Sequence, residues 1–297
     1  MINERRAGIS FMKVDFIGAH MSIAGGCVKA WERAEMVGCQ SLQIFTKNNM
    51  QWEGCALSEE TVAAFRKRSA EVHFPVCGHV GYLINLGTNK SPTAHRSTIS
   101  LAEELERAEQ LGLPFLILHP GNHMGAGEAA GIKTISSNLR TILKKSPAKK
   151  VKIAIETTAG QGTCIGHRFE HLAEIYEQVS IPSRIGFCFD TCHVFAAGYD
   201  LSTARGLANT LKEFDRLLGL DKIMAFHFND SKTGLGSRVD RHEHIGKGHI
   251  GIEPFREILN TRAFAKIPKI LETPKGPQGR EDINNLKVLR GLMRNPA

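Results

Sequence analysis

Histidine, aspartate and glutamate residues recur where apolar runs of this sequence end. A single residue of this kind is explained well enough by a structural hydrogen bond. Several imidazoles and carboxylates brought together without a cation would be costly to bury, so metal binding explains the whole set better. The residues that end such runs are His79 (after VCG), His119 (after FLIL), Glu156 (after KIAI), Asp190 (after IGFCF), His227 (after IMAF) and Glu272 (after KIL).

Two short motifs add candidate ligands to this set. Asp190 and His193 lie three residues apart in the motif DTCH, where a strand-like run gives way to a helix. Asp240 and His242 flank Arg241, so both side chains can point the same way from an extended backbone. Alone, the second motif fits a solvated loop, but beside His193 it indicates a further metal site. Nitrogen and oxygen donors without a clear cysteine suit Zn²⁺ or Mn²⁺ at a hydrolytic centre, and such clusters cleave phosphodiesters.

The elements that would position these residues alternate along the chain. Each short apolar run is followed by a turn that contains glycine or proline and then by an amphipathic stretch. We predict helices in three of these amphipathic stretches, at residues 98–111, 169–179 and 286–293. A doubly wound open sheet would give the same alternation. Eight runs favour a (β/α)8 TIM barrel, because its strands all open onto one face, where the candidate ligands would meet. The predicted strands are residues 14–20, 41–46, 76–80, 115–119, 152–156, 185–190, 223–228 and 269–272.

Composition limits the class of protein further. The 297 residues are 42% hydrophobic and 23% charged, which is ordinary for a globular chain and excludes general disorder. No signal peptide and no spanning stretch of about 18 apolar residues is visible. The net charge of +8 favours an anionic partner such as nucleic acid, and the seven cysteines indicate reduced thiols. We predict a flexible extension over residues 1–13 and a single barrel domain over residues 14–297.

Several motifs together resemble those of endonuclease IV, the zinc-dependent type 2 apurinic/apyrimidinic endonuclease family. They follow the family's order from about residue 14 to residue 293, which is nearly the whole chain. They are GAHMS (18–22), FTKN (45–48), HVGYLINL (79–86), HPGNH (119–123), ETTAGQG (156–162), FDTCH (189–193), HFNDS (227–231), DRH (240–242), GKG (246–248) and LETP (271–274).

The resemblance implies a TIM barrel that holds three zinc ions. The first would be bound by His79, His119 and Glu156. Glu156 would bridge to the second, which Asp190, His227 and Glu272 would also hold, and it would act in catalysis by orienting or deprotonating the nucleophile. The third zinc would lie between His193, Asp240 and His242.

The resemblance also implies the reaction. The substrate would be double-stranded DNA, cut by hydrolysis of the phosphodiester 5′ to an abasic site to leave a 3′-hydroxyl and a 5′-deoxyribose phosphate. Blocked 3′ ends would be trimmed at the same phosphate site. A bent duplex with a flipped abasic nucleotide would be recognised, because a missing base has already lost its stacking energy. We expect a monomer without a membrane or obligatory protein partner, acting in the cytoplasm of a bacterial-type cell.

Three residues are predicted to contact DNA, and one of them departs from the family. Tyr82 is retained at an inserting position, whereas Met50 stands where the family usually has arginine. Methionine keeps an apolar wedge but loses the charge, so binding should be weaker or less salt-dependent with the chemistry intact. Trp52 would line the abasic pocket or anchor its loop. Thr157 replaces the usual asparagine after the bridging glutamate, with a modest expected effect.

Two other functions stay open. Metal-dependent sugar isomerases and epimerases share the Glu-Asp-His-Glu arrangement at the strand ends, but they generally lack the set formed by His193, Asp240 and His242. A DNA-binding barrel without activity is the non-enzymatic alternative. The complete set of ligand types argues against it, because purely structural binding would not require all of them.

Overall fold

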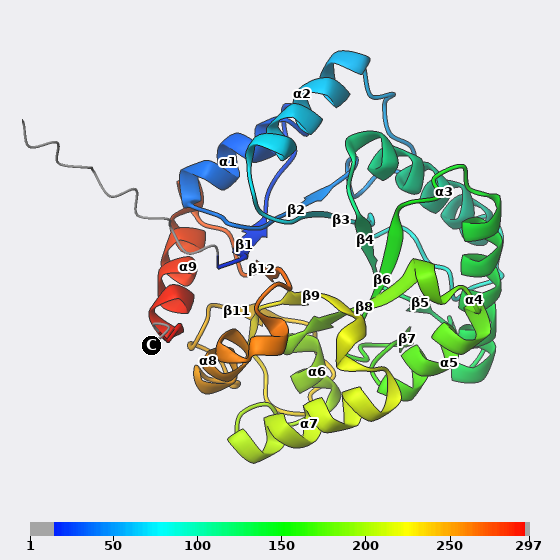
Figure 1. Ribbon diagram of the computed structural model, residues 1–297. Helices are drawn as coiled ribbons and strands as arrows, with labels where there is room; N and C mark the ends of the chain where they lie inside the picture. Colours follow the sequence, from blue (N-terminus) through cyan, green and yellow to red (C-terminus); the bar gives the residue numbers. More distant parts are fainter. Residues whose placement is uncertain (1–14, 295–297) are drawn as a thin grey trace, which may run out of the picture.

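The part of the chain that the computed structural model describes, residues 15–294, contains a closed barrel of eight parallel strands (Figure 1). Strand β1 pairs with both β2 and β12, so the first and last strands close the barrel. The predicted TIM barrel is therefore confirmed and the open sheet is excluded; the predicted extension at 1–13 lies outside the described residues. The barrel strands are β1 (Ile17–His20), β2 (Leu42–Phe45), β3 (Val76–His79), β4 (Phe115–Leu118), β6 (Lys152–Glu156), β8 (Ile185–Asp190), β9 (Ile223–His227) and β12 (Lys269–Leu271).

Side chains alternate between the two faces of each strand, and this alternation aims the candidate ligands. Outward residues such as Ile153 and Ile155 of β6 pack in the main core between strands and helices. Inward residues form a second, smaller cluster inside the barrel. Each of five candidate ligands lies two positions beyond a member of that inner cluster, so it points inward too. The pairs are Cys77 and His79, Ile117 and His119, Ala154 and Glu156, Cys188 and Asp190, and Ala225 and His227.

Helices surround the barrel, as Figure 1 shows. They bury one apolar stripe against the strands; in α3, for example, Leu101, Leu105, Ala108 and Leu111 are buried, and Gly112 ends the helix in a left-handed conformation. The α-helices are α1 (Lys29–Val37), α2 (Glu59–Glu71), α3 (Thr93–Leu111), α4 (Glu128–Lys145), α5 (Phe169–Val179), α6 (Thr191–Ala197), α7 (Ala204–Leu217), α8 (Glu253–Asn260) and α9 (Arg280–Leu292).

Two short strand pairs that the apolar pattern did not predict lie at the carboxyl end of the barrel. Strand β5 (Gly121–Asn122) pairs antiparallel with β7 (Cys164–Ile165), and β10 (Asp230–Ser231) forms a hairpin with β11 (His242–Glu243). Two-residue strands carry no periodic signal. The β10–β11 hairpin brings His242 back toward the strand ends.

Several predicted element bounds were wrong by a few residues. The first strand begins at Ile17, because the Asp15 carboxylate accepts a hydrogen bond from the Ile17 amide in a turn and Phe16 has a φ of 48°. Helix α3 begins at Thr93 instead of residue 98, and α9 begins at Arg280 instead of residue 286. Both missed first turns are mainly polar, so they do not extend the apolar stripe. The predicted helix at 169–179 is confirmed as α5.

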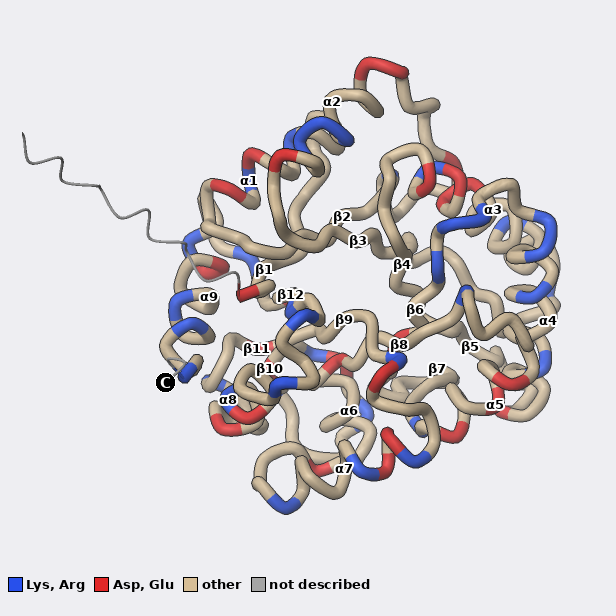
Figure 2. Tube along the Cα trace, viewed as in Figure 1, with Lys and Arg blue, Asp and Glu red and all other residues tan. Residues whose placement is uncertain are grey.

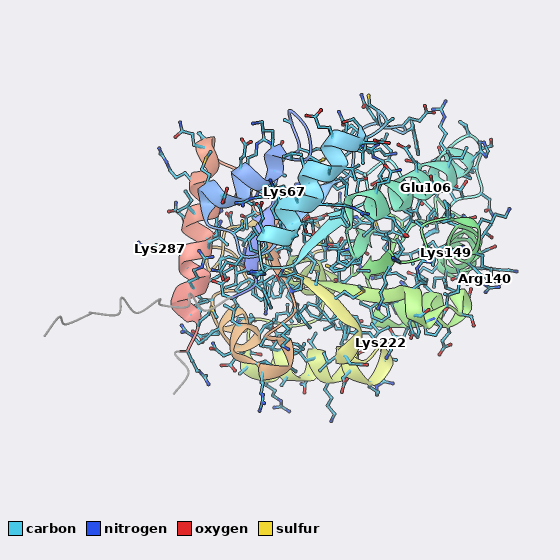
Figure 3. The ribbon with its side chains drawn as sticks, turned by 45° about the horizontal axis from the view of Figure 1, so that its top comes forward. Lys67, Glu106, Arg140, Lys149, Lys222 and Lys287 are labelled. Atoms are coloured by element: carbon cyan, nitrogen blue, oxygen red, sulfur yellow. The ribbon has the colours of Figure 1, made fainter. Side chains whose placement is uncertain are left out.

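The charged residues lie mainly on the outer helices and loops. In Figure 2 the barrel strands are largely free of Lys, Arg, Asp and Glu colours, and Figure 3 shows Lys67, Arg140 and Lys287 on the perimeter helices α2, α4 and α9. All three side chains are exposed. None of the helices in residues 15–294 is long and apolar enough to cross a membrane.

Candidate metal centre

The carboxyl ends of the barrel strands bring the predicted ligands together. His79, Glu156, Asp190 and His227 are the last residues of β3, β6, β8 and β9. His119 and Glu272 follow directly after β4 and β12. The remaining three come from other elements, which are α6 for His193, the loop before β11 for Asp240, and β11 for His242.

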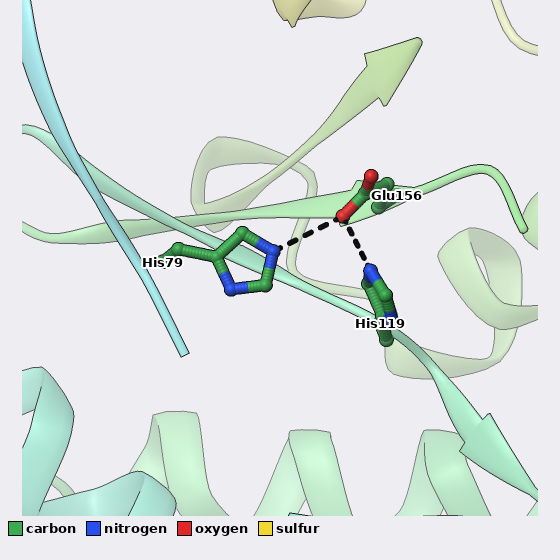
Figure 4. A group of neighbouring side chains, drawn as sticks. All are labelled: His79, His119 and Glu156. Atoms are coloured by element: carbon green, nitrogen blue, oxygen red, sulfur yellow. Dashed lines mark hydrogen bonds and ion pairs between the residues drawn. The ribbon is translucent and has the colours of Figure 1, made fainter. Parts of the chain in front are cut away.

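Glu156 is at the centre of this cluster and is fully buried. Its Oε2 lies 3.3 Å from Nε2 of His79 and 2.9 Å from Nε2 of His119 (Figure 4). Its Oε1 lies 2.8 Å from Nδ1 of His227. One carboxylate oxygen therefore faces a histidine pair on one side, and the other oxygen faces a different histidine, as expected of a bridging ligand.

The second predicted group surrounds His227. Its Nδ1 lies 3.3 Å from Oε2 of Glu272 and 3.7 Å from Oδ2 of Asp190. Asp190 also lies 3.7 Å from Nε2 of His242, so its carboxylate connects this group to the next one.

The third predicted group combines α6 with the loop that leads into β11. Asp240 lies 3.2 Å from Nε2 of His193 through Oδ2 and 3.4 Å from Nε2 of His242 through Oδ1. Asp190 caps α6, because its Oδ1 accepts a hydrogen bond from the backbone amide of His193 at 2.8 Å. The cap fixes where His193 begins its helix and hence where its ring lies.

Hydrogen bonds on the far side of four rings set which nitrogen faces the cluster. His79, His193 and His242 each direct Nδ1 at a backbone carbonyl, of Val80, Thr157 and Glu272 respectively. His227 directs Nε2 at the side-chain oxygen of Gln43 at 2.8 Å. In the neutral rings the opposite nitrogen then presents a lone pair to the carboxylates.

Imidazole lone pairs that face carboxylate oxygens repel them, and a cation bound between them would remove that repulsion. Nε2 of His193 and Nε2 of His242 are buried without a hydrogen-bond partner among the described residues. Imidazole nitrogens held by carbonyls, with carboxylates beside them, are the ligand set and outer contacts that zinc uses in proteins. The residues present therefore fit divalent metal ions.

The pKa shifts within the cluster also show strong interactions between its carboxylates and imidazoles. Burial alone would raise the pKa of Glu156, but the charges of His227 and His119 hold that pKa well below its usual value. Burial alone would lower the pKa of His227, but Cys188 and the carboxylates of Glu272 and Glu156 raise it well above its usual value. Both shifts follow from the attraction between neighbouring carboxylates and imidazoles, which favours the charged form of each group.

Comparison with known proteins places the chain in a family. The family model described as "Xylose isomerase-like TIM barrel" matches residues 31–291. The protein named "Probable endonuclease 4" of Geobacter sulfurreducens is 48% identical over 282 residues, which cover 94% of this chain and 95% of that protein. The chain belongs to the endonuclease IV family. Another protein of that printed name, from Chloroflexus aurantiacus, is 48% identical over 278 residues, covering 93% of this chain and 97% of the other.

Solved structures agree with membership of the endonuclease IV family. Endonuclease IV from Thermus thermophilus superposes with a TM-score of 0.80 at 36% identity, over 93% of this chain and 98% of that one. A D-tagatose 3-epimerase-like protein superposes with a TM-score of 0.69 at 16% identity, covering 93% and 96% of the two chains. The second likeness shows a shared barrel fold alone.

Two polar residues that support the cluster were not predicted from the sequence. Gln43, inside β2, donates its amide hydrogens to Glu272 and to Nδ1 of His20, at 2.6 and 2.8 Å, while its oxygen faces His227. Asn229 donates to Asp190 Oδ2 at 2.8 Å and accepts from the Glu272 amide at 2.8 Å. An amide in an apolar strand, as in Leu-Gln-Ile-Phe, was the available signal for Gln43.

Thr157, which replaces the asparagine usual in the endonuclease IV family, also contacts this set. Its hydroxyl accepts a hydrogen bond from the Asp190 amide at 3.0 Å, and its carbonyl lies 2.9 Å from Nδ1 of His193. The hydroxyl thus supports a candidate ligand through the backbone.

Two cysteines lie beside the cluster of candidate ligands. Cys188 lies with Glu156 and His227, and Cys192 lies with Asp240 and His242, at distances compatible with metal binding. Burial raises the pKa of each thiol to about 12. Cys188 belongs to the small cluster inside the barrel, and the Cys192 thiol faces the carbonyl of Arg241 at 3.5 Å.

The residues predicted to contact DNA lie in two neighbouring loops, the Met50 loop (residues 46–55) and the Tyr82 loop (residues 80–84). Met50 is 63% exposed and Tyr82 is 58% exposed. The Tyr82 ring packs edge-on against Phe45 and His79, beside a cavity of about 550 Å³ that reaches His119, His193 and Asp240. Trp52 instead packs against the core, and its carbonyl accepts hydrogen bonds from Lys47 and Ser100.

Proposed function

We propose that this chain is a zinc-dependent DNA-repair endonuclease with three zinc ions per chain. It hydrolyses the phosphodiester 5′ to an abasic site, leaving a 3′-hydroxyl and a 5′-deoxyribose phosphate, and trims blocked 3′ ends. The observation that carries the proposal is the convergence of nine imidazole and carboxylate side chains on one end of the barrel, with the two oxygens of Glu156 facing different histidines.

The proposed zinc ligands divide into three groups. His79, His119 and Glu156 would hold the first ion, and Asp190, His227 and Glu272 would hold the second together with Glu156. His193, Asp240 and His242 would hold the third. Zinc bound there would supply Lewis acidity toward the phosphate and would make water a nucleophile near neutral pH.

The chain's own residues fix the geometry of this chemistry. Gln43 and Asn229 hold the carboxylates of Glu272 and Asp190 by hydrogen bonds, so these groups need little reorganisation when substrate binds. Glu156 has no exposed surface and faces the histidines with both oxygens, which suits it to orient or deprotonate an attacking water. Tyr82 stands exposed beside the cavity and Met50 stands exposed on the neighbouring loop, where they would contact the duplex at the lesion.

The third group distinguishes this proposal from a sugar isomerase or epimerase. Those barrels generally use the Glu-Asp-His-Glu set alone, whereas the Asp240 oxygens here lie 3.2 Å from His193 and 3.4 Å from His242. A third ion beside the cavity suits the charge that develops on a leaving oxygen of a phosphodiester.

The proposal is tested with purified protein, metal analysis and an oligonucleotide duplex that carries one abasic site. About three zinc ions per chain and incision 5′ of the lesion are expected, with incision lost after chelation and regained with zinc. An intact-strand duplex and a panel of ketoses serve as controls. Two metal ions with ketose turnover and no incision would contradict the proposal.

A further inference from the structure

We propose that Glu104 of α3 is a positioning residue that locks the Met50 loop and the Tyr82 loop together, so that they engage damaged DNA as one unit. This inference rests on the proposed function. It concerns a buried carboxylate outside the metal centre.

Glu104 has no exposed surface and binds both loops directly. Its Oε2 accepts a hydrogen bond from the hydroxyl of Thr46, in the Met50 loop, at 3.0 Å. Its Oε1 accepts one from the backbone amide of Gly81, in the Tyr82 loop, at 3.0 Å. The two oxygens of one side chain therefore connect segments that lie far apart in the sequence.

The loops also contact each other at this point. The Tyr82 amide donates to the carbonyl of Asn49 at 3.2 Å, one residue before Met50. A Cβ on Gly81 would lie only 3.2 Å from that carbonyl and 3.3 Å from Glu104 Oε1, so glycine allows the close approach. A shift of one loop must therefore disturb the other.

Other charged residues on the same face of α3 hold only the Met50 loop. Arg107 donates to the Thr46 carbonyl, at 3.0 and 2.7 Å, and to the Cys55 carbonyl at 2.6 Å. Glu103 accepts from the Gly54 amide at 2.9 Å and from Lys47 at 3.1 Å. Glu103 is thus a matched control, a neighbouring carboxylate with partners in one loop.

A buried side chain that holds both loops would order the backbone that carries Met50 and Tyr82, although these two side chains are 63% and 58% exposed. Exposed side chains contribute most to affinity when their conformation is already ordered in the free protein, because less entropy is then lost on binding. Losing one buried hydrogen bond of this kind changes an equilibrium by about tenfold.

The experiment measures steady-state incision of the abasic duplex by zinc-loaded variants. Glu104→Ala and the isosteric Thr46→Val should raise KM about tenfold while kcat, zinc content and hydrolysis of bis(4-nitrophenyl) phosphate stay at parental values. Glu104→Gln should restore KM, because an amide can still accept from Gly81 and donate to Thr46. Equal KM values in the parent and Thr46→Val would overturn the proposal.

A mutant cycle tests whether the loops act as one unit. Met50→Ala and Tyr82→Ala, alone and combined, should be non-additive in KM in the parent and in Glu103→Gln. The non-additivity should shrink in Thr46→Val, which removes the hydrogen bond to Glu104 but keeps the one from Tyr82 to Asn49. Non-additivity of unchanged size in Thr46→Val, or none in the parent, would contradict coupling through Glu104.

Amide hydrogen exchange separates this inference from the proposed function, since it needs no activity. Glu104→Ala should speed exchange in residues 46–55 and 80–84 together, whereas Glu103→Gln should do so in 46–55 alone. If the parent does not cut abasic DNA, the proposed function fails but the exchange result still decides the coupling. Faster exchange in a single loop of Glu104→Ala would overturn it.

Discussion

Glu156 and Glu104 are both fully buried glutamates, yet their surroundings shift their pKa values in opposite directions. Burial raises the pKa of Glu104, and the Gly81 amide and Lys47 offset only part of that rise. For Glu156 the same effect of burial is overcome by the charges of His227 and His119, and its pKa falls well below the usual value. Burial thus sets no direction by itself; the number of cationic partners decides.

The difference also separates two uses of a buried carboxylate. Glu156 lies at a strand end, where barrel register fixes its position and the surroundings favour cations. Glu104 lies on an outer helix and ties loops together through hydrogen bonds from Thr46 and Gly81, with Lys47 as a cationic neighbour at 4.0 Å. The first arrangement suits metal chemistry, and the second suits the control of loop shape.

The largest expected effect comes from Glu156→Gln. Removing the negative charge that faces His79, His119 and His227 should reduce zinc content and lower incision of abasic DNA at least about 100-fold, since losing an outer contact of a metal ligand already costs 10–100-fold. Glu104→Gln is the matched control, with zinc content and kcat unchanged. Equal loss of zinc from both variants, measured by elemental analysis, would contradict the distinction between Glu156 and Glu104.

A smaller effect is expected when a supporting contact of the metal centre is removed. Gln43→Ala frees both Glu272 and the outer nitrogen of His227, so zinc affinity should fall by about 10–100-fold. Competition with a fluorescent chelator measures that affinity. Gln51→Ala, at an exposed residue of the Met50 loop, is the control that should leave it unchanged.

Met50→Arg should strengthen the contribution of the loops with the metal centre unaltered. The added cation should tighten binding to abasic duplex and steepen the dependence of log Kd on log salt by about one counterion. Met36→Arg places the same charge on α1, at a side chain that is 65% exposed. An identical slope in both variants would mean that the Met50 loop does not face the DNA backbone.

The smallest effect is a pair of opposite pH dependences in the metal-free protein. Glu156 has a lowered pKa, so it stabilises the fold above about pH 4.5, and that contribution is lost as the pH falls. Glu104 has a raised pKa, so its contribution weakens as the pH rises from 4.5 through its own pKa. A folded-state pKa that differs by one from the unfolded-state pKa changes the free energy of unfolding by about 1.4 kcal/mol.

Chemical denaturation of the parent, Glu156→Gln and Glu104→Gln between pH 4 and pH 8 measures these contributions. The difference between parent and variant should grow with pH for Glu156 and shrink with pH for Glu104. If the difference in the free energy of unfolding changed with pH in the same direction for both variants, the distinction between the two glutamates would be lost.

Much of the fold and of the cluster could be predicted because both follow from strand periodicity. Apolar runs marked the barrel strands, and residues such as Glu156 and Asp190 stood where those runs end, so parallel strands had to bring them together. Helix α5 was predicted at its observed bounds because its apolar residues repeat with helical spacing.

The remaining features depend on contacts between distant segments. Gln43 is one polar residue in an apolar strand, and only the barrel shows that it contacts Glu272 and His227. Glu104 was indistinguishable from the other acids of its helix until the fold placed Thr46 and Gly81 beside it. Short hairpins such as β10–β11 were missed because two residues carry no period.

Closure of the barrel by β1 and β12 has a consequence during protein synthesis. Glu272 follows the last barrel strand, so a nascent polypeptide lacks one carboxylate of the centre until β12 has left the ribosome. A prematurely terminated product that ends before β12 lacks that carboxylate and the strand that seals the barrel. One segment therefore completes both the barrel and the proposed cutting site, so a truncated product has neither of them complete.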